Sequence, residues 1–311
     1  MKSINFVLLG DSGLAAELGK KGTSTDLAIY DRKSADTVYT WTTVVTYPEK
    51  IQPLLQAISI GEYAILNVTK IDKFLGEQIM ALDAAGPKSG FIIHSYEIDH
   101  EKLKTLAKDT SLSNYIFVES IEQLKSEMAK VSSLGAAGPL TISTDHAFDV
   151  KGVGTVVLGV VRRGLVKAYD NLELLPQRKT ILVKSIQMHD DPVAEAASPA
   201  RVGLAIKGAD ADEIARGDIL CSPGSVSLSG TTLMIQFSKS RFFKGDLPEN
   251  HTYLLSVGAQ IRSVKIKVHG EGKLELTVER PIAFVPGQNC TLLKPDSPST
   301  RIIGRGEIIQ G

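Results

Sequence analysis

The chain has 311 residues, of which 43% are hydrophobic and 23% charged, the composition of a globular protein of two or three domains. Its 35 basic and 35 acidic residues cancel, and the 11 Lys and Arg against 7 Asp and Glu in residues 226–311 form only a modest excess, so charge alone does not indicate a nucleic-acid partner. No apolar run approaches membrane-spanning length and the first residues enter a strand directly, so we expect neither a membrane span nor a signal peptide.

Residues 1–137 alternate strands with helices. Strand-length runs of apolar or β-branched residues lie at 5–10, 26–30, 37–46, 63–68, 91–94 and 115–118. Between them, apolar residues recur at helical spacing at Ile51, Leu54, Leu55 and Ile58. Asp99 and Ser120 are suited to cap two further helices. This alternation predicts an α/β domain with a mostly parallel sheet.

The periodicity changes after the small-residue linker at 135–139. From there apolar and polar residues alternate, as in 264–268, where Val and Ile face one way and the lysines the other. Short strands separated by glycine corners are typical of small closed barrels. A break near 222–225 divides this part, so we predict two β-barrel domains, 138–223 and 224–311, after an α/β domain at 1–137.

The segment 146–222 carries the most specific pattern. It begins His146-Ala-Phe-Asp-Val-Lys-Gly-Val-Gly-Thr and later contains Val202-Gly-Leu-Ala-Ile and Ile214-Ala-Arg-Gly-Asp. This pattern resembles the second domain of translational GTPases of the elongation factor Tu and SelB family, and 280–308 resembles the end of their third domain. The likeness is closest to SelB-like archaeal factors of the EF-Pyl type, whose name links them to pyrrolysine decoding. It implies a translation factor whose first domain has the GTPase fold.

The phosphate-binding motif of that fold, G-x-x-x-x-G-K-[ST], is missing. The first strand ends in Gly10-Asp11-Ser12-Gly13, Gly19-Lys20 comes one residue late, and Lys21 stands where the magnesium-binding hydroxyl belongs. We expect Lys20 at the end of a short helix, away from any phosphate. Weak nucleotide binding at the turn formed by Gly10, Asp11, Ser12 and Gly13 remains an alternative.

The other GTPase motifs implied by the resemblance are also missing. Residues 22–25 leave no room for switch I, and Asp-x-Pro-Gly-His is replaced by Thr46-Tyr-Pro-Glu-Lys. The guanine-reading Asn-Lys-x-Asp is replaced by His94-Ser-Tyr-Glu, while Thr69-Lys-Ile-Asp matches it in letters one strand too early. We therefore expect a degenerate GTPase domain without GTP hydrolysis and without a cofactor.

The resemblance also assigns positions to the aminoacyl end of tRNA. They fall on Asp145, His146, Phe148, Leu158 and Arg201. His146, Leu158 and Arg201 depart from the residues usual in elongation factor Tu, which implies an unusual esterified amino acid. The alternative is that Phe148 and Leu158 pack the barrel core.

Basic residues of the last domain are candidates for contacts with the tRNA backbone. Lys239, Arg241 and Lys244 flank Phe242 and Phe243 in an expected loop, and Arg262, Lys265 and Lys267 form a second candidate patch. A solvated loop anchored by the two phenylalanines is the alternative to the first. The six histidines offer no metal site, His189-Asp-Asp-Pro indicates a polar hairpin turn, and no catalytic residues are expected. Two cysteines without metal-ligand spacing suit buried thiols in a reducing cytoplasm.

The sequence thus predicts a cytoplasmic, monomeric, SelB-like translation elongation factor. It would bind a specialised aminoacyl-tRNA and engage the ribosome, with GTP binding and hydrolysis lost and with no DNA or membrane partner. Two alternatives stay open. One is a divergent elongation factor that still uses GTP and magnesium, and the other is a protein-interaction scaffold without RNA.

Overall fold

The computed structural model describes residues 2–249, 251–298 and 300–310. It divides into two compact units, Met1–Ser133 with Pro295–Ile303, and Leu134–Lys294 with Gly304–Gly311. The predicted domain limits at 137/138 and 223/224 fall in connecting segments, the first before residue 141 and the second between residues 221 and 227. Among the described residues, no helix is long and apolar enough to cross a membrane.

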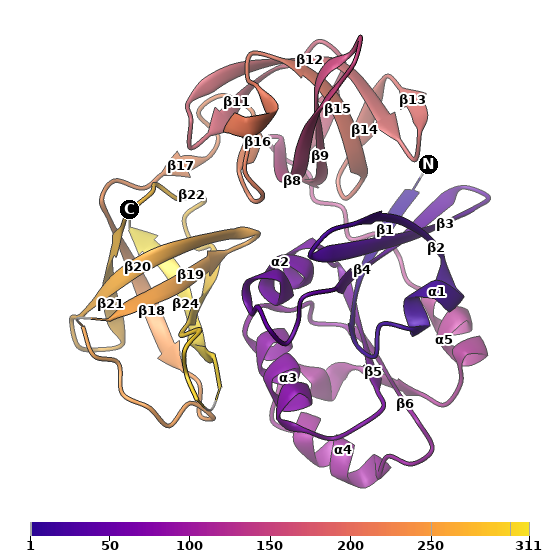
Figure 1. The fold of residues 1–311 in the computed structure, drawn as a ribbon, viewed down its shortest axis with the longest axis vertical. Helices are drawn as coiled ribbons and strands as arrows, with labels where there is room; N and C mark the ends of the chain where they lie inside the picture. Colours follow the sequence, from indigo (N-terminus) through magenta and orange to yellow (C-terminus); the bar gives the residue numbers. More distant parts are fainter. Residues whose placement is uncertain (1, 250, 299, 311) are drawn as a thin grey trace. The chain divides into compact units, whose positions relative to one another are not determined.

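The first unit is a seven-stranded sheet in the order β2-β3-β4-β1-β5-β6-β7 (Figure 1). The four neighbouring pairs from β4 through β7 are parallel, and β2 and β3 extend the sheet antiparallel. The strands are β1 (Lys2–Gly10), β2 (Lys20–Ser24), β3 (Leu27–Ser34), β4 (Thr37–Val44), β5 (Tyr63–Val68), β6 (Gly90–His94) and β7 (Ile116–Val118). The predicted α/β domain with a mostly parallel sheet is confirmed.

Helices cover both faces of this sheet (Figure 1). They are α1 (Leu14–Leu18), α2 (Gln52–Ile60), α3 (Lys73–Ala85), α4 (His100–Ala107) and α5 (Ile121–Met128), with a 3₁₀ turn at Ser111–Asn114. Helices α1 and α5 share a core with the alternate β1 residues Phe6 and Leu8. The predicted apolar face of α2 is buried, and Asp99 and Ser120 accept hydrogen bonds from the first-turn amides of α4 and α5.

One local prediction was wrong, because Lys20 does not end a helix. Helix α1 stops at Leu18, and Gly19 is extended with a φ of −156°. A Cβ at Gly19 would lie 2.7 Å from the Asp31 carbonyl oxygen and 2.8 Å from the Trp41 ring, so the chain passes close to β3 and β4 there. Lys20 consequently begins the edge strand β2.

The second unit begins with a six-stranded closed barrel. Its strands are β8 (Thr141–Val150), β9 (Gly154–Arg163), β11 (Asn171–Leu175), β12 (Lys179–Met188), β15 (Arg201–Lys207) and β16 (Ile219–Cys221). They run β11-β16-β8-β9-β15-β12, and pairing of β11 with β12 closes the ring. The short strands β10 (Leu165–Lys167) and β14 (Glu195–Ala197) pair, and β13 (Asp191–Val193) forms a hairpin with β12. The predicted turn at His189 and Asp190 connects that hairpin.

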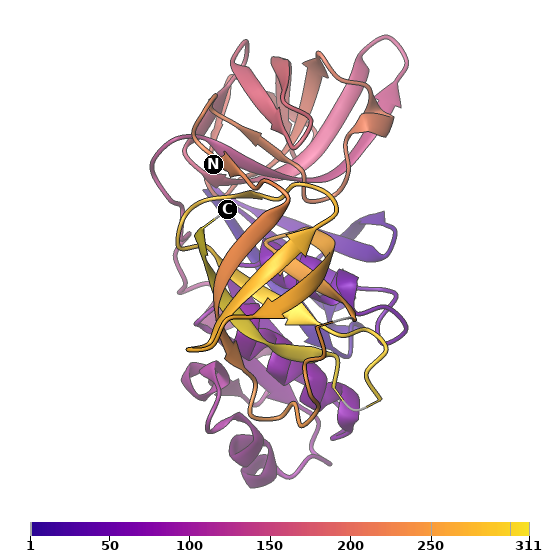
Figure 2. The same ribbon diagram turned by 90° about the vertical axis from the view of Figure 1, so that its left-hand side faces the viewer.

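A second closed barrel follows, in the order β18-β21-β20-β19-β23-β24 (Figure 2, orange to yellow). Its strands are β18 (Thr232–Lys239), β19 (Thr252–Val257), β20 (Gln260–Val268), β21 (Lys273–Val278), β23 (Asn289–Leu293) and β24 (Ile302–Gln310). The strands β17 (Ser227–Leu228) and β22 (Ala283–Phe284) pair beside it. Val264 and Ile266 are buried while Lys265 and Lys267 are exposed, as the alternation predicts, but Val268 at the end of the run is 51% exposed. The predicted succession of one α/β domain and two barrels is confirmed.

Candidate functional site

The site residues of the first barrel are arranged around a β-bulge in β8. The register with β9 shifts between Thr144 and His146, which makes Asp145 the extra residue. A bulge turns its side chain away from the regular alternation. Because of this shift, Ile142 and Thr144 are buried before the bulge, whereas His146 and Phe148 are exposed after it. The bulge therefore decides which side chains reach the surface.

The Asp145 side chain is 7% exposed and lies between two arginines. Its Oδ2 accepts a hydrogen bond from Nη2 of Arg201 at 2.5 Å, and its Oδ1 lies 3.4 Å from Nε of Arg216. The same Nε donates to the Asp145 backbone oxygen at 3.1 Å. Two guanidinium groups on one carboxylate fix the geometry of the bulge.

Exposed side chains lie beside this cluster on the outer face of the barrel. The rings of His146 and Phe148 are 5.7 Å apart, and Phe148 is 37% exposed. Leu158 lies opposite His146 on one side and Gly203 on the other, and it is half-buried. The alternative was that Phe148 and Leu158 pack the barrel core. It is wrong for Phe148, which is exposed, and the half-buried Leu158 also lies outside the core cluster formed by residues such as Ile142, Val157 and Leu204.

Arg216 is a residue that our sequence reasoning did not assign to the site. It precedes Gly217, whose φ is +86° and whose Cβ, if present, would lie 2.5 Å from the Ala259 backbone. The Gly217 amide donates a hydrogen bond to the Thr144 backbone oxygen, and this bond holds the turn against β8. The Arg216-Gly217 pair in the segment 214–218 could have indicated a turn with an arginine beside it. The sequence did not show that this arginine would contact β8.

In the turn after β1, where GTPases bind phosphate, two backbone amides already have acceptors within the protein. The Asp11 amide donates to the Asn67 backbone oxygen at 2.9 Å, and the Gly13 amide donates to Oδ1 of Asp11 at 2.8 Å. Gly10, with a φ of +83°, lies so close to Asn67 that a Cβ would overlap its oxygen. Ser12 completes a three-residue connection to the five-residue helix α1. The Asp11 carboxylate thus occupies the Gly13 amide, at a position where a bound phosphate would need a free backbone amide.

The residues near the guanine-reading positions have structural partners. Asp72, in the segment that matches the guanine motif in letters, caps α3 by accepting from the Phe74 and Leu75 amides, and it pairs with Lys70 at 2.9 Å. At the end of β6, Nε2 of His94 lies 3.0 Å from Nδ1 of His100. Sequence spacing did not predict this histidine pair. Within the described ranges, no three His, Cys, Asp or Glu side chains gather as a metal site.

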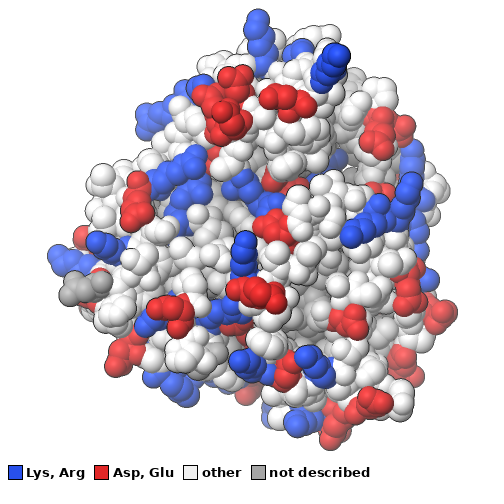
Figure 3. Space-filling view, in the orientation of Figure 1, with Lys and Arg blue, Asp and Glu red and all other residues white. Residues whose placement is uncertain are grey.

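The basic loop between β18 and β19 combines one anchor with one exposed aromatic side chain. Phe243 is buried, whereas Phe242 is 43% exposed with the Arg241 guanidinium 4.6 Å from its ring centroid. Lys239 was expected in the loop but is the last residue of β18, where it donates to the Gly245 oxygen; Lys244 is exposed in the loop. Of the two phenylalanines expected as possible anchors, only Phe243 has that role. Lys and Arg side chains are intermixed with Asp and Glu over the face in Figure 3.

Arg262 does not share a patch with Lys265 and Lys267, contrary to the prediction. It lies an odd number of positions from both lysines, on the other face of β20. There its side chain is 10% exposed and Nη2 lies 3.1 Å from Oδ1 of the fully buried Asp218. Burial lowers the pKa of Arg262, and the Asp218 charge opposes this effect. Arg262 therefore joins β20 to the segment before β16.

The comparisons with known proteins agree with this architecture. The family model for elongation factor Tu domain 2 matches residues 154–221. An uncharacterised protein of Methanocaldococcus jannaschii is 33% identical over 311 residues, covering 99% of this chain and 100% of that protein. The selenocysteine-specific elongation factor of the same organism is 27% identical over 277 residues, covering 75% of this chain and 59% of that protein. The chain belongs to the elongation factor Tu and SelB family.

Solved structures of this family have the same fold. Translation elongation factor SelB from Methanococcus maripaludis, in complex with the GTP analogue GppNHp, matches with a TM-score of 0.82 at 22% identity. The match covers 99% of this chain and 79% of SelB. The chain therefore has the structure of a SelB-like elongation factor, although it spans only about three fifths of the selenocysteine-specific relative.

Proposed function

We propose that this SelB-like protein binds the aminoacyl end of a tRNA on the outer face of β8, β9 and β15, and that it does so without GTP. The observation that carries the proposal is the exposed Phe148 ring beside His146, next to the Asp145–Arg201–Arg216 cluster. The resemblance to elongation factor Tu assigns Asp145, His146, Phe148 and Arg201 to the aminoacyl end, whereas Arg216 joins them only through its contacts with Asp145. Its cytoplasmic location, monomeric state and contact with the ribosome belong to the same proposal.

Support for base stacking comes from the exposure of Phe148. An aromatic side chain with free ring surface offers a stacking platform for a terminal base, worth about 1–3 kcal/mol per base. On the neighbouring strands, Leu158 is half-buried and Gly203 beside it has no side chain, so no large side chain protrudes next to Phe148. A planar base can approach such a surface closely.

Support for recognition of a charged or polar group comes from Arg201. Its side chain is 13% exposed, and Nη1 is buried with no hydrogen-bond partner among the described residues. Nη2 is held by Asp145. Because Nη1 is buried, a ligand would reach this guanidinium only through the small exposed part of the side chain, which the Asp145 contact holds in a fixed geometry.

Support for the loss of GTP binding comes from the turn after β1. The Asp11 carboxylate accepts the Gly13 amide and adds a negative charge, so a phosphate there would lose a donor and be repelled. The missing lysine and hydroxyl remove the other phosphate and magnesium contacts. The domain would then act as a scaffold for the tRNA-binding barrels.

The proposal is tested by measuring retention of charged and uncharged tRNA on the purified protein, after the RNA that copurifies with it has been sequenced. We expect preferential retention of one charged tRNA species and slower hydrolysis of its ester bond in the complex. Equal retention of both forms would contradict an aminoacyl site. No RNA binding would favour the protein scaffold, and tight GTP binding would favour the divergent GTPase.

A further inference from the structure

A short segment of the second unit, residues 214–218, contacts both of its barrels. In the first barrel it meets β8 at Thr144, the residue immediately before the bulge. The Thr144 amide donates to the Asp218 backbone oxygen at 2.9 Å, and the Gly217 amide donates to the Thr144 oxygen at 2.8 Å. The Thr144 hydroxyl donates to the Ala215 oxygen at 2.8 Å. Three hydrogen bonds thus hold β8 at the point where its register shifts.

The second barrel holds the other side of this segment through the Asp218 side chain. Its carboxylate is fully buried, and Oδ1 lies 3.1 Å from Nη2 of Arg262 on β20. Oδ2 lies 3.6 Å from Nη2 of Arg280, which follows β21. The same Oδ2 accepts from Nε2 of Gln177 at 2.6 Å and from the Ala215 amide at 2.9 Å. Because an unpaired buried charge is costly, the two arginines keep Asp218 and its segment on the second barrel.

Arg216 connects the segment to the bulge itself. Its Nε donates to the Asp145 backbone oxygen at 3.1 Å and lies 3.4 Å from Oδ1 of the same residue. Asp145 in turn accepts a hydrogen bond from Arg201. The bulge turns the side chains that follow it outward, so the exposure of His146 and Phe148 depends on the geometry that these contacts hold. A continuous set of contacts therefore leads from the second barrel to the proposed aminoacyl surface.

We propose that Asp218 is a positioning residue for the binding of charged tRNA. Held by the second barrel, it keeps residues 214–218 against β8 and so maintains the bulge that presents His146 and Phe148. This inference rests on the proposed function, because it requires that those two side chains bind the aminoacyl end. Arg262 then acts through Asp218 and makes no contact with a tRNA phosphate. Its loss should weaken the binding of charged tRNA without changing the salt dependence of that binding.

The first measurement uses the free protein and the variant Arg262→Met. Hydrogen exchange of the Thr144 amide, relative to that of the Val161 amide in the same barrel, reports the contact with Asp218. We expect this ratio to rise about tenfold in Arg262→Met. It should stay unchanged in the control Phe237→Ala, which destabilises the second barrel by loss of packing. An unchanged ratio in Arg262→Met, or an equal rise in both variants, overturns the inference.

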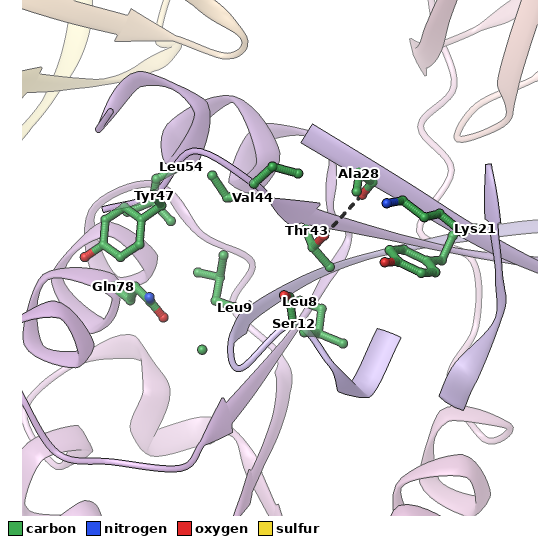
Figure 4. Close-up of a pocket in the computed structure, with 13 residues that line it drawn as sticks. Leu8, Leu9, Ser12, Lys21, Ala28, Thr43, Val44, Tyr47, Leu54 and Gln78 are labelled. Atoms are coloured by element: carbon green, nitrogen blue, oxygen red, sulfur yellow. Dashed lines mark hydrogen bonds between the residues drawn. The ribbon is translucent and has the colours of Figure 1, made fainter. Parts of the chain in front are cut away.

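The second measurement is the affinity for one tRNA, charged and uncharged, at several salt concentrations. Arg262→Met should weaken charged-tRNA binding about tenfold, with the slope of log Kd against log salt unchanged. Lys21→Met controls for the loss of one positive charge, because Lys21 lines a pocket of the first unit with Leu8 and Ser12 (Figure 4). It should change neither quantity. In a Phe148→Ala background, Arg262→Met should have a smaller effect, because both changes act on the same surface.

The double variant Asp218→Asn with Arg262→Met removes both buried charges, so it replaces Arg262→Met if that variant fails to fold, with the same expected results. The inference alone is overturned if the variant still prefers charged tRNA and binds it with wild-type affinity. It is also overturned if the salt slope falls by about one phosphate contact, which would place Arg262 on the tRNA. A wild-type protein that binds both tRNA forms equally overturns the proposed function, and this inference with it.

Discussion

Truncation of Phe148 separates a binding role from a structural role. A buried Phe→Ala substitution costs about 3–5 kcal/mol of folding stability. Phe148 is 37% exposed and outside the barrel core, so we expect Phe148→Ala to lower the free energy of unfolding by no more than about 1.5 kcal/mol. Loss of one stacked base should weaken charged-tRNA binding by about 1–3 kcal/mol, or roughly fivefold to 150-fold.

The assay for Phe148→Ala combines urea unfolding with titration of charged tRNA. Phe237→Ala is the matched control, because Phe237 is 8% exposed in β18 and should lose stability without a direct effect on binding. The reasoning is refuted if Phe148→Ala loses several kcal/mol of stability while its tRNA affinity equals that of the wild type. Phe148 would then be a packing residue.

Four further predictions follow from particular contacts. Glu77, which is 7% exposed, pairs with Arg301 of the segment 295–303 in the first unit. Glu77→Gln leaves Arg301 without its partner, so it should lower the free energy of unfolding in urea by about 3–5 kcal/mol, whereas Glu77→Leu combined with Arg301→Met should lower it less. Equal losses of stability in the two variants would contradict this. Burial raises the pKa of the Cys221 thiol to about 11 and of the Cys290 thiol to about 12, so both should remain unreactive toward iodoacetamide at pH 8 until the protein unfolds, and rapid native alkylation would refute their burial. Lys239→Ala and Arg241→Ala should each reduce the salt dependence of tRNA binding by about one phosphate contact, and an unchanged slope would exclude the basic loop. GTP and GDP should bind with a Kd weaker than about 10 μM in the presence of magnesium, equivalent to roughly −7 kcal/mol, and tighter binding in calorimetry would contradict a degenerate site.

Periodicity predicted the fold because burial follows it in most elements. The i, i+3, i+4 spacing around Leu54 marks the buried face of α2, and the alternation around Ile266 marks the inner face of β20. The same alternation would have placed Arg262 and Lys265, which are three positions apart, on opposite faces of β20. In β2 the local sequence is polar throughout, and its strand conformation depends on pairing with β3, which no local pattern of β2 predicts.

The candidate site was less predictable, because it depends on a bulge and on long-range contacts. One extra residue at Asp145 reverses the faces of the residues that follow, so simple alternation would have placed Phe148 inside the barrel. Arg216 meets Asp145 across 71 positions of sequence. The segment 295–303 joins the first unit through Arg301 and Glu77, a pairing that is specified only by the folded chain.

The most direct test of the central claim is the affinity of the protein for one tRNA, charged and uncharged, each with and without GTP and magnesium. Our account predicts that the charged form binds more tightly and that GTP changes neither affinity. Equal affinities for the two forms would contradict the aminoacyl site. Tight binding of the charged form only when GTP is present would contradict the loss of nucleotide function.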